Sequence, residues 1–180
     1  MAHSLRSILV LTVLTFIIAC SPKAASQTDL EFRVSGRITQ THSYCGGARP
    51  PADLLKKLNA PVPYAGKKLF VRSGTSNLTE KSIIREFTAD SSGYFSIKLP
   101  AGTYCVVVEE QVKALDIQSF NNKTTKYLKL DESCLQQWWG KCLMTFDVAN
   151  SDKSDLNINF HFPCFTGGIP CMTYTGPLPQ

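Results

Sequence analysis

The sequence predicts a mainly β protein: a β-sandwich of seven or eight short strands, with one or two short helices and a C-terminal tail pinned by a disulfide. Three observations lead to this fold class. Several short segments alternate apolar and polar side chains, glycine and proline turn signals separate them, and an even number of cysteines follows the N-terminal segment. The 180 residues suffice for one domain after a targeting segment.

The N-terminal segment 1–19 has the order of a signal peptide: a basic start, a short apolar run and a small residue before the cleavage point. The run is too short to cross a bilayer, which takes about 20 residues. Ala19 directly before Cys20 resembles the lipobox of bacterial lipoproteins, which implies acylation of Cys20, with palmitate for example, as the new N-terminus. The alternative is an ordinary signal peptide cleaved elsewhere. Ser21, in place of Asp, resembles lipoproteins that are sent to an outer membrane.

The mature chain is expected to consist of a flexible, polar tether at 20–28 and a single domain at 29–180. The formal net charge of +5 at pH 7 is modest, and the Lys and Arg residues are scattered. No stretch resembles the basic segments that track phosphates, so we expect no nucleic-acid partner. The expected partners are the membrane, reached through the lipid on Cys20, and a protein of the cell envelope.

The first strand is expected at 30–38. Val34 and Ile38 fall on the same face as the other apolar residues of this segment, and Gly36 in that register indicates a bulge or a close backbone approach. The segment 39–66 combines paired glycines and prolines, so it is expected to be irregular.

The stretch 90–109 is the strongest local signal, and it predicts a β-hairpin. Asp90 to Gly93 forms a turn, and the following residues alternate apolar and polar side chains up to Leu99. The sequence Pro100-Ala-Gly102 reverses the chain, and a second alternating segment follows from Tyr104. The pattern predicts half of a sandwich core.

Alternation and turn residues predict the remaining strands, at 67–72, 82–89, 126–130, 143–148 and 156–162. A short helix at 52–58 has leucines at helical spacing. A second helix is expected at 133–139, with Asp131 or Ser133 as its cap. The tail 163–180 contains Pro, Gly, large apolar residues and two cysteines, so we expect an ordered lid pinned by a disulfide.

Six cysteines remain once Cys20 is assigned to the lipid, and an even number in an exported chain indicates disulfides. They are Cys45, Cys105, Cys134, Cys142, Cys164 and Cys171. The sequence does not choose among the connectivities, but two local pairs are attractive, Cys134–Cys142 and Cys164–Cys171, leaving Cys45–Cys105. The first pair requires a helix break near Gly140, because eight residues of straight helix separate Cα atoms by about 12 Å, beyond the roughly 7 Å limit.

The run Gly93-Tyr-Phe-Ser-Ile-Lys-Leu-Pro-Ala-Gly-Thr-Tyr104 resembles the hairpin of the carboxypeptidase-regulatory-like and transthyretin-like superfamily, and segments 34–38 and 65–71 resemble its opening strands. The resemblance spans roughly 31–110. It implies a prealbumin-like β-sandwich and says little about function. The cysteine-bearing segments fall outside it and resemble additions found in small lipoproteins of Bacteroidetes-type bacteria. The hydroxyisourate hydrolases of this superfamily end in Tyr-Arg-Gly-Ser; here Tyr174-Thr-Gly-Pro stands instead, so that activity is not implied.

Trp138 and Trp139 are the strongest candidates for a binding surface. Adjacent helical residues point about 100° apart, so one indole would pack on the sandwich and the other would be exposed. The interpretation that the sequence favours, however, is that both are buried between helix, sheet and tail, because large aromatic side chains dominate cores. Tyr44 and Tyr174 lie in loops that would accompany an exposed indole.

A zinc site is an alternative interpretation of the two segments that contain a His-x-x-Cys motif. His42-x-x-Cys45 and His161-x-x-Cys164 share one spacing, and four such residues can hold zinc in a tetrahedral site. An oxidising compartment favours disulfides instead, and strand parity points His161 outward. We therefore expect no metal and no cofactor.

These features favour a non-catalytic, membrane-anchored lipoprotein that acts as a structural or protein-interaction module in the cell envelope. The alternative is a ligand-binding module, for a glycan for example, that uses Trp138 or Trp139 and the loops near Tyr44 and Tyr174. A hydrolase is the least favoured class, since the sequence contains no Gly-x-Ser-x-Gly nucleophile elbow.

Overall fold

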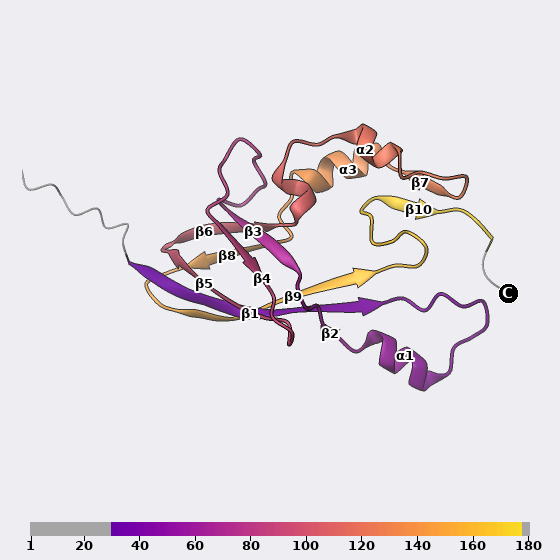
Figure 1. Ribbon diagram of the computed structural model, residues 1–180, viewed down its shortest axis with the longest axis horizontal. Coiled ribbons are helices and arrows are strands. Elements are labelled where there is room, and N and C mark those ends of the chain that lie inside the picture. Colours follow the sequence, from indigo (N-terminus) through magenta and orange to yellow (C-terminus); the bar gives the residue numbers. More distant parts are fainter. Residues whose placement is uncertain (1–29, 178–180) are drawn as a thin grey trace, which may run out of the picture.

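Two four-stranded sheets share the main apolar core of the domain, and a two-stranded sheet lies beyond them (Figure 1). The computed structural model describes residues 30–177. The expected signal peptide 1–19, the lipidation site Cys20 and the tether 20–28 lie outside the described residues. Within 30–177 the chain is mainly β, with ten strands and three α-helices.

The first sheet is built around β1 (Glu31–His42). One edge of β1 pairs antiparallel with β5 (Tyr94–Pro100) and β2 (Val62–Pro63), and its other edge pairs parallel with β9 (Lys153–Phe162). The first and the last long strands of the domain are therefore neighbours.

The second sheet is antiparallel, in the order β4 (Arg85–Thr88), β3 (Lys68–Ser73), β6 (Gly102–Val107) and β8 (Met144–Val148). The small sheet pairs β7 (Leu128–Leu130) with β10 (Met172–Tyr174). The helices are α1 (Ala52–Asn59), α2 (Ile117–Asn121) and α3 (Glu132–Trp139), and a 3-10 helix covers Glu109–Val112.

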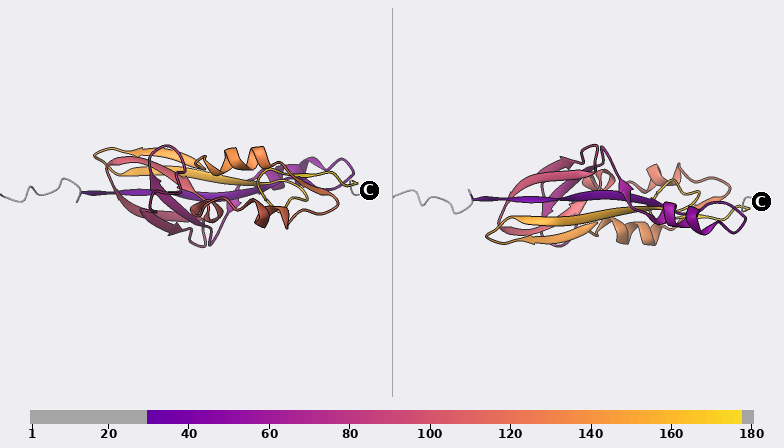
Figure 2. Two further views of the ribbon diagram at one scale, coloured as in Figure 1. Left: turned by 90° about the horizontal axis from the view of Figure 1, so that it is seen from above. Right: turned by 90° about the horizontal axis from the view of Figure 1, so that it is seen from below.

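Alternate side chains from both sheets fill the main core. Val34 and Ile38 of β1, Leu69 of β3 and Leu99 of β5 are completely buried, and each such side chain contributes about 1.5–3 kcal/mol through burial. On β9, Leu156 and Ile158 are buried as the alternation predicts, whereas the last inward residues are only half-buried. Figures 1 and 2 show that the ends of β1 and β9 extend beyond the second sheet, toward α1 and β10.

The bulge predicted at Gly36 is confirmed. The register of β1 against β9 shifts between Val34 and Gly36, which is a β-bulge. A Cβ at Gly36 would overlap the backbone of Leu156, so only glycine allows β9 to approach this closely.

The hairpin prediction for 90–109 is wrong, although both of its strands form. β5 pairs with β1 in the first sheet, and β6 pairs with β3 and β8 in the second, so the chain crosses between sheets at Pro100–Gly102. The alternation of apolar and polar residues correctly predicts both strands but does not show which strand each one pairs with. β6 is buried on both faces: Tyr104 and Val106 face the main core, whereas Cys105 and Val107 form a second cluster with Phe70.

The strand count exceeds the prediction because the expected loop 39–66 contains β2 and the tail contains β10; the same loop is also shortened by β1. β1 continues to His42, and its second half carries polar side chains that hide it from a search for apolar alternation. Thr39 Oγ1 donates to Asn159 Oδ1 (3.0 Å), and Asn159 Nδ2 donates to Thr41 Oγ1 (3.2 Å), across the parallel pair.

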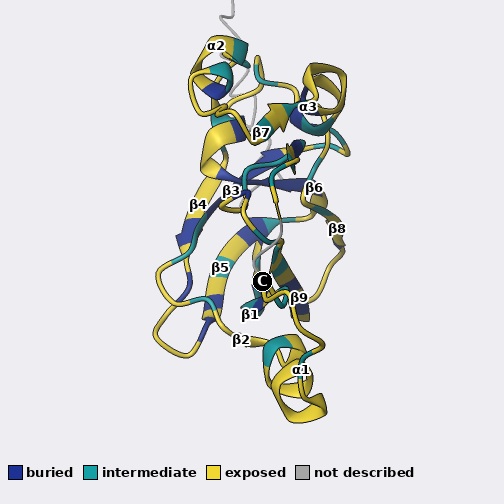
Figure 3. Cartoon of the chain, turned by 90° about the vertical axis from the view of Figure 1, so that its right-hand side faces the viewer, coloured by how far each residue is buried: buried dark blue, intermediate teal, exposed yellow. Residues whose placement is uncertain are grey.

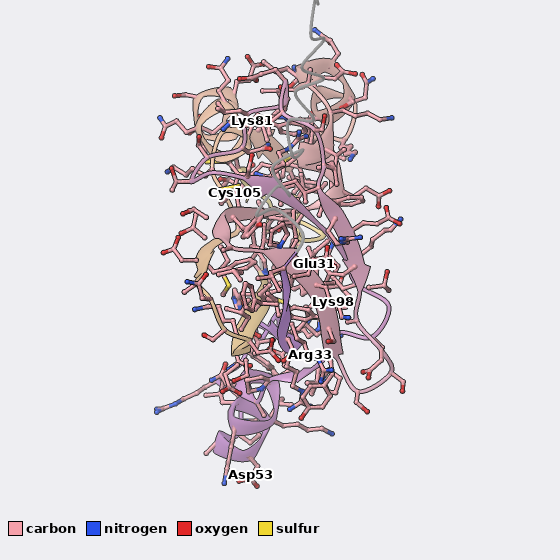
Figure 4. The ribbon with its side chains drawn as sticks, turned by 90° about the vertical axis from the view of Figure 1, so that its left-hand side faces the viewer. Glu31, Arg33, Asp53, Lys81, Lys98 and Cys105 are labelled. Atoms are coloured by element: carbon pink, nitrogen blue, oxygen red, sulfur yellow. A yellow bond between two sulfur atoms is a disulfide. The ribbon has the colours of Figure 1, made fainter. Side chains whose placement is uncertain are left out.

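Helix α1 forms where the leucine spacing predicts, but it buries none of its residues. Leu54 and Leu55 are 37% and 39% exposed. Figure 3 shows α1 almost entirely in the exposed colour, and Figure 4 shows Asp53 at the tip of the molecule. The spacing of apolar residues therefore predicted the helix but not its packing.

All six candidate cysteines are in disulfides, but the local pairs are wrong. The bridges are Cys45–Cys164, Cys105–Cys142 and Cys134–Cys171, with Cα atoms 5.4, 5.3 and 5.7 Å apart. Strand pairing decides the connectivity: His42 lies opposite Phe162, so the cysteines that follow β1 and β9 meet. Helix α3 does end before Gly140, as expected, without a Cys134–Cys142 bridge.

Candidate ligand groove

Helix α3 is fixed at both ends by side-chain hydrogen bonds. Asp131 is its N-cap, as the sequence predicts, and accepts from the Cys134 amide at 2.9 Å. At the other end Gln111, which is 2% exposed, donates from Nε2 to the carbonyls of Trp138 and Lys141, both at 2.9 Å. They add a buried side-chain donor to the carbonyls at and just after the end of α3; the Trp138 carbonyl also accepts from the Lys141 amide at 3.1 Å.

Asn77 completes this polar clamp from the loop after β3. Its Nδ2 donates to the carbonyl of Trp139 at 2.8 Å and to that of Gln111 at 2.9 Å. These bonds hold the backbone at the end of α3, from which both indoles project.

The two indoles face different surroundings. Trp139 is 7% exposed and lies in a separate cluster with Phe120 and Leu135, where its Nε1 donates to the Lys113 carbonyl at 2.9 Å. Trp138 is half-buried and meets Trp139 edge-on at 5.7 Å. The divergence expected for adjacent helical residues is present, with Trp138 at the more open position.

The overhanging end of β9 supplies an aromatic floor opposite α3. Phe160 and Phe162 point to the inner side, and Tyr64 meets them edge-to-face, at 5.4 and 5.8 Å between ring centroids. The Nζ of Lys67 lies 5.0 Å from the Phe160 centroid and 5.6 Å from that of Tyr64. This arrangement places a cation on two aromatic faces.

The tail closes a third side. It is pinned at two points, by Cys45–Cys164 and Cys134–Cys171, rather than by the expected bridge within the tail. Gly168 has φ +74 and packs on the Phe162 ring, so a side chain there would overlap the ring. The Asp131 amide donates to the Cys171 carbonyl at 3.0 Å, which brings the tail beside the start of α3.

These elements enclose a groove of about 460 Å³. Its apolar and aromatic walls come from Tyr64, Val108, Trp138, Leu143, Phe160, Phe162, Ile169 and Met172, and its charged groups from Lys67 and Glu110. A cleft of roughly 300–1,000 Å³ with apolar walls and few polar groups is the usual form of a small-molecule site. The sequence pointed to Trp138 but missed the floor, because Phe160 and Phe162 read as ordinary core positions.

The other candidate binding residues lie elsewhere. Tyr44 is half-buried beside the Cys45–Cys164 bridge, with its ring against Gly46. Tyr174 packs on Phe165 (4.5 Å between centroids) and Tyr127 (6.3 Å), and we call these three residues the distal aromatic patch. Phe165 and Tyr127 are each 38% exposed. The structure therefore separates Tyr44 and Tyr174 from the two tryptophans with which the sequence grouped them.

The two His-x-x-Cys motifs do meet, but their sulfur atoms are bonded to each other rather than free to ligate zinc. His42 stacks on Phe162 at 5.1 Å on the inner side of the sheet, whereas His161 lies on the outer side. Across residues 30–177, three or more His, Cys, Asp or Glu side chains nowhere gather as metal ligands would.

His161 takes part in a polar ladder that sequence reasoning missed. Its Nε2 lies 2.9 Å from Ser43 Oγ, and its Nδ1 lies 3.2 Å from Thr41 Oγ1. A hydroxyl beside an imidazole is the start of a nucleophile–base pair. In a catalytic triad a carboxylate orients the imidazole. Here the Thr41 hydroxyl stands in that place, and the His161 imidazole is exposed to solvent. We infer that these side-chain hydrogen bonds stabilise the parallel register of β1 and β9.

No helix within 30–177 has the length and apolarity needed to cross a membrane. No protein-family model matches the chain, and no curated protein is similar enough to be a relative.

Proposed function

We propose that the chain is a lipid-anchored, non-catalytic binding module of the cell envelope, held to the outer membrane through Cys20, that binds its ligand in the groove. We further propose that the two sheets form a β-sandwich of the prealbumin-like type, as the resemblance of 93–104 implies. With this proposal we favour the ligand-binding function over a purely structural role.

The observation that carries the proposal is the position of Trp138. Gln111 bonds the backbone carbonyl of Trp138, and the half-exposed indole lines a groove whose other walls include Tyr64 and Phe160. A flat aromatic face of this kind stacks on the apolar C–H face of a sugar ring, and groups such as Lys67 and Glu110 suit its hydroxyls. A glycan is therefore the proposed ligand class.

The shape of the domain suits a tethered binding role. Glu31 begins β1 at one end of the elongated molecule, and β9 ends near α1 and β10 at the other end (Figure 1). A tether that joins Cys20 to the Glu31 end would place the groove away from the membrane surface.

A glycan array probed with the full-length protein in detergent tests the ligand class. We expect glycan binding that is lost in Trp138→Ala and kept in Tyr94→Ala, the matched control, since Tyr94 is an exposed aromatic residue on another element. Absence of binding by the wild type, or equal binding by Trp138→Ala, would overturn the groove assignment.

Membrane fractionation tests the anchor separately. The Cys20→Ala variant should leave the membrane fraction, because the acylated thiol is the proposed attachment. If that variant stays with the membrane, the anchor assignment is wrong.

A second candidate is an envelope protein that docks on the distal aromatic patch. Phe165 has φ 64, a left-handed conformation that is costly for an aromatic residue, and it remains 38% exposed. A photo-crosslinker at position 165 should give a discrete product in cells, and the same crosslinker at position 94 should not. Identical patterns from both positions would reject this candidate.

A further inference from the structure

Lys67 is the cation of the groove, and its ammonium group has no carboxylate partner among residues 30–177. The ion pairs of that range are Lys68–Glu86 at 3.0 Å and Arg85–Glu31 at 2.8 Å, both away from the groove. The Lys67 ammonium rests instead on the Phe160 and Tyr64 rings. Cation–π contacts leave its N–H donors available for another acceptor.

We propose that the groove selects saccharides that carry a carboxylate, with Lys67 pairing with the carboxylate while Trp138 stacks on the sugar ring. This inference rests on the proposed function, namely saccharide binding in the groove, and adds the charge of the ligand to it. The charge complementarity follows from Lys67, an unpaired ammonium on the floor of the groove.

The energetics favour discrimination by charge. A hydrogen bond between an ammonium and a carboxylate is roughly twice as strong as one between neutral groups. Lys67 is half-buried, so salt and water screen its interactions less than those of a fully exposed lysine. An acidic sugar should therefore bind at least about tenfold more tightly than its neutral counterpart, the ratio that about 1.4 kcal/mol provides.

Glu110 also lines the groove and is exposed. Its carboxylate repels an anionic ligand, so the sugar carboxylate should lie toward Lys67. Removing this like charge in Glu110→Gln should raise the affinity for the acidic sugar relative to the affinity for the neutral sugar.

The test compares methyl glucuronide with methyl glucoside, which differ only in a carboxylate and a hydroxymethyl group. Each is titrated calorimetrically into full-length protein in detergent. We expect the glucuronide to bind at least about tenfold more tightly, and Lys67→Gln to remove that preference. Lys68→Gln is the matched control: the neighbouring lysine pairs with Glu86, so its loss should leave the preference intact.

The outcomes separate the two levels of the proposal. Equal binding of the two glycosides, or a preference that survives Lys67→Gln, would overturn the inference about charge and leave saccharide binding in place. Failure of the wild type to bind either glycoside would also overturn the inference about charge. Failure to bind any sugar of the array would overturn the proposed function and this inference with it.

Discussion

The disulfide between Cys134 and Cys171 joins two sides of the groove, helix α3 and the tail. Cys134 lies in the first turn of α3, and Cys171 lies in the tail immediately before β10, with their Cα atoms 5.7 Å apart. The tail is therefore attached to the same helix that presents Trp138. The position of the lid relative to the indole depends on this covalent link.

Removal of this bridge should open the groove. In Cys134→Ser/Cys171→Ser we expect stronger quenching of tryptophan fluorescence by acrylamide, weaker glycan binding, and a loss of about 4 kcal/mol in the free energy of unfolding from the 37-residue separation. The control is Cys45→Ser/Cys164→Ser, which closes a longer loop, with a separation of 119 residues. It should lose at least as much stability while leaving the quenching unchanged. Equal quenching in both variants would contradict the lid role of Cys171.

The close approach at Gly36 should make β1 intolerant of a side chain. Gly36→Ala places a methyl group against the Leu156 backbone, so we expect a loss of about 1–3 kcal/mol in chemical denaturation. Gly140→Ala is the matched control, because its nearest atom lies 4.0 Å from the added Cβ and its φ is −77. That variant should be neutral or slightly stabilised. Similar losses in the two variants would show that the β1–β9 contact is looser than described.

The Gln111 clamp should be essential for α3. Gln111→Leu leaves the carbonyls of Trp138 and Lys141 without their buried donor, and we expect a loss of about 2–4 kcal/mol in urea unfolding together with weaker glycan binding. Gln137→Leu makes the same chemical change at an exposed position of α3, so it should alter stability by less than about 0.5 kcal/mol. A neutral Gln111→Leu would mean that other contacts hold the helix.

Tyr104 should make stability fall at high pH. Its hydroxyl donates to the Pro100 carbonyl at 2.8 Å, and burial, followed by the negative charge of Glu31, raises the pKa of Tyr104 above its ordinary value. Because the folded pKa exceeds the unfolded one, this contribution is complete below about pH 10 and is lost as the pH rises through the folded pKa. Tyr104→Phe should cost about 1 kcal/mol at pH 7 and decline less steeply above pH 10. Parallel declines in the two proteins would contradict this.

Local patterns in the sequence predicted most strands, because alternation reports directly which side chains face a core. They did not predict partners. β5 and β6 carry equally clear alternation, yet they belong to different sheets, and only contacts between distant strands decide this. The same limit explains the disulfides: Cys45 and Cys164 are 119 residues apart and meet through the parallel pairing of β1 with β9.

The candidate site was predictable only in part. Trp138 stood out as one of two adjacent indoles, but the floor formed by Phe160 could not be told from core by strand parity alone. It lines a groove because β9 continues past the second sheet, and strand length relative to a neighbouring sheet is not encoded in a local pattern. The sequence likewise did not single out Lys67, because its place in the groove depends on the Tyr64 and Phe160 rings beneath its ammonium group.

The most direct test of ligand binding in the groove is the response of the two indole N–H resonances in nitrogen-15 NMR. The chain contains only two tryptophans, so each signal can be assigned with Trp138→Phe. Titration of the full-length protein in detergent with a glycan selected on the array should shift the Trp138 signal and leave that of Trp139, whose Nε1 is bonded to Lys113, in place. A shift of the Trp139 signal alone, or no shift of either signal at saturation, would contradict binding in the groove.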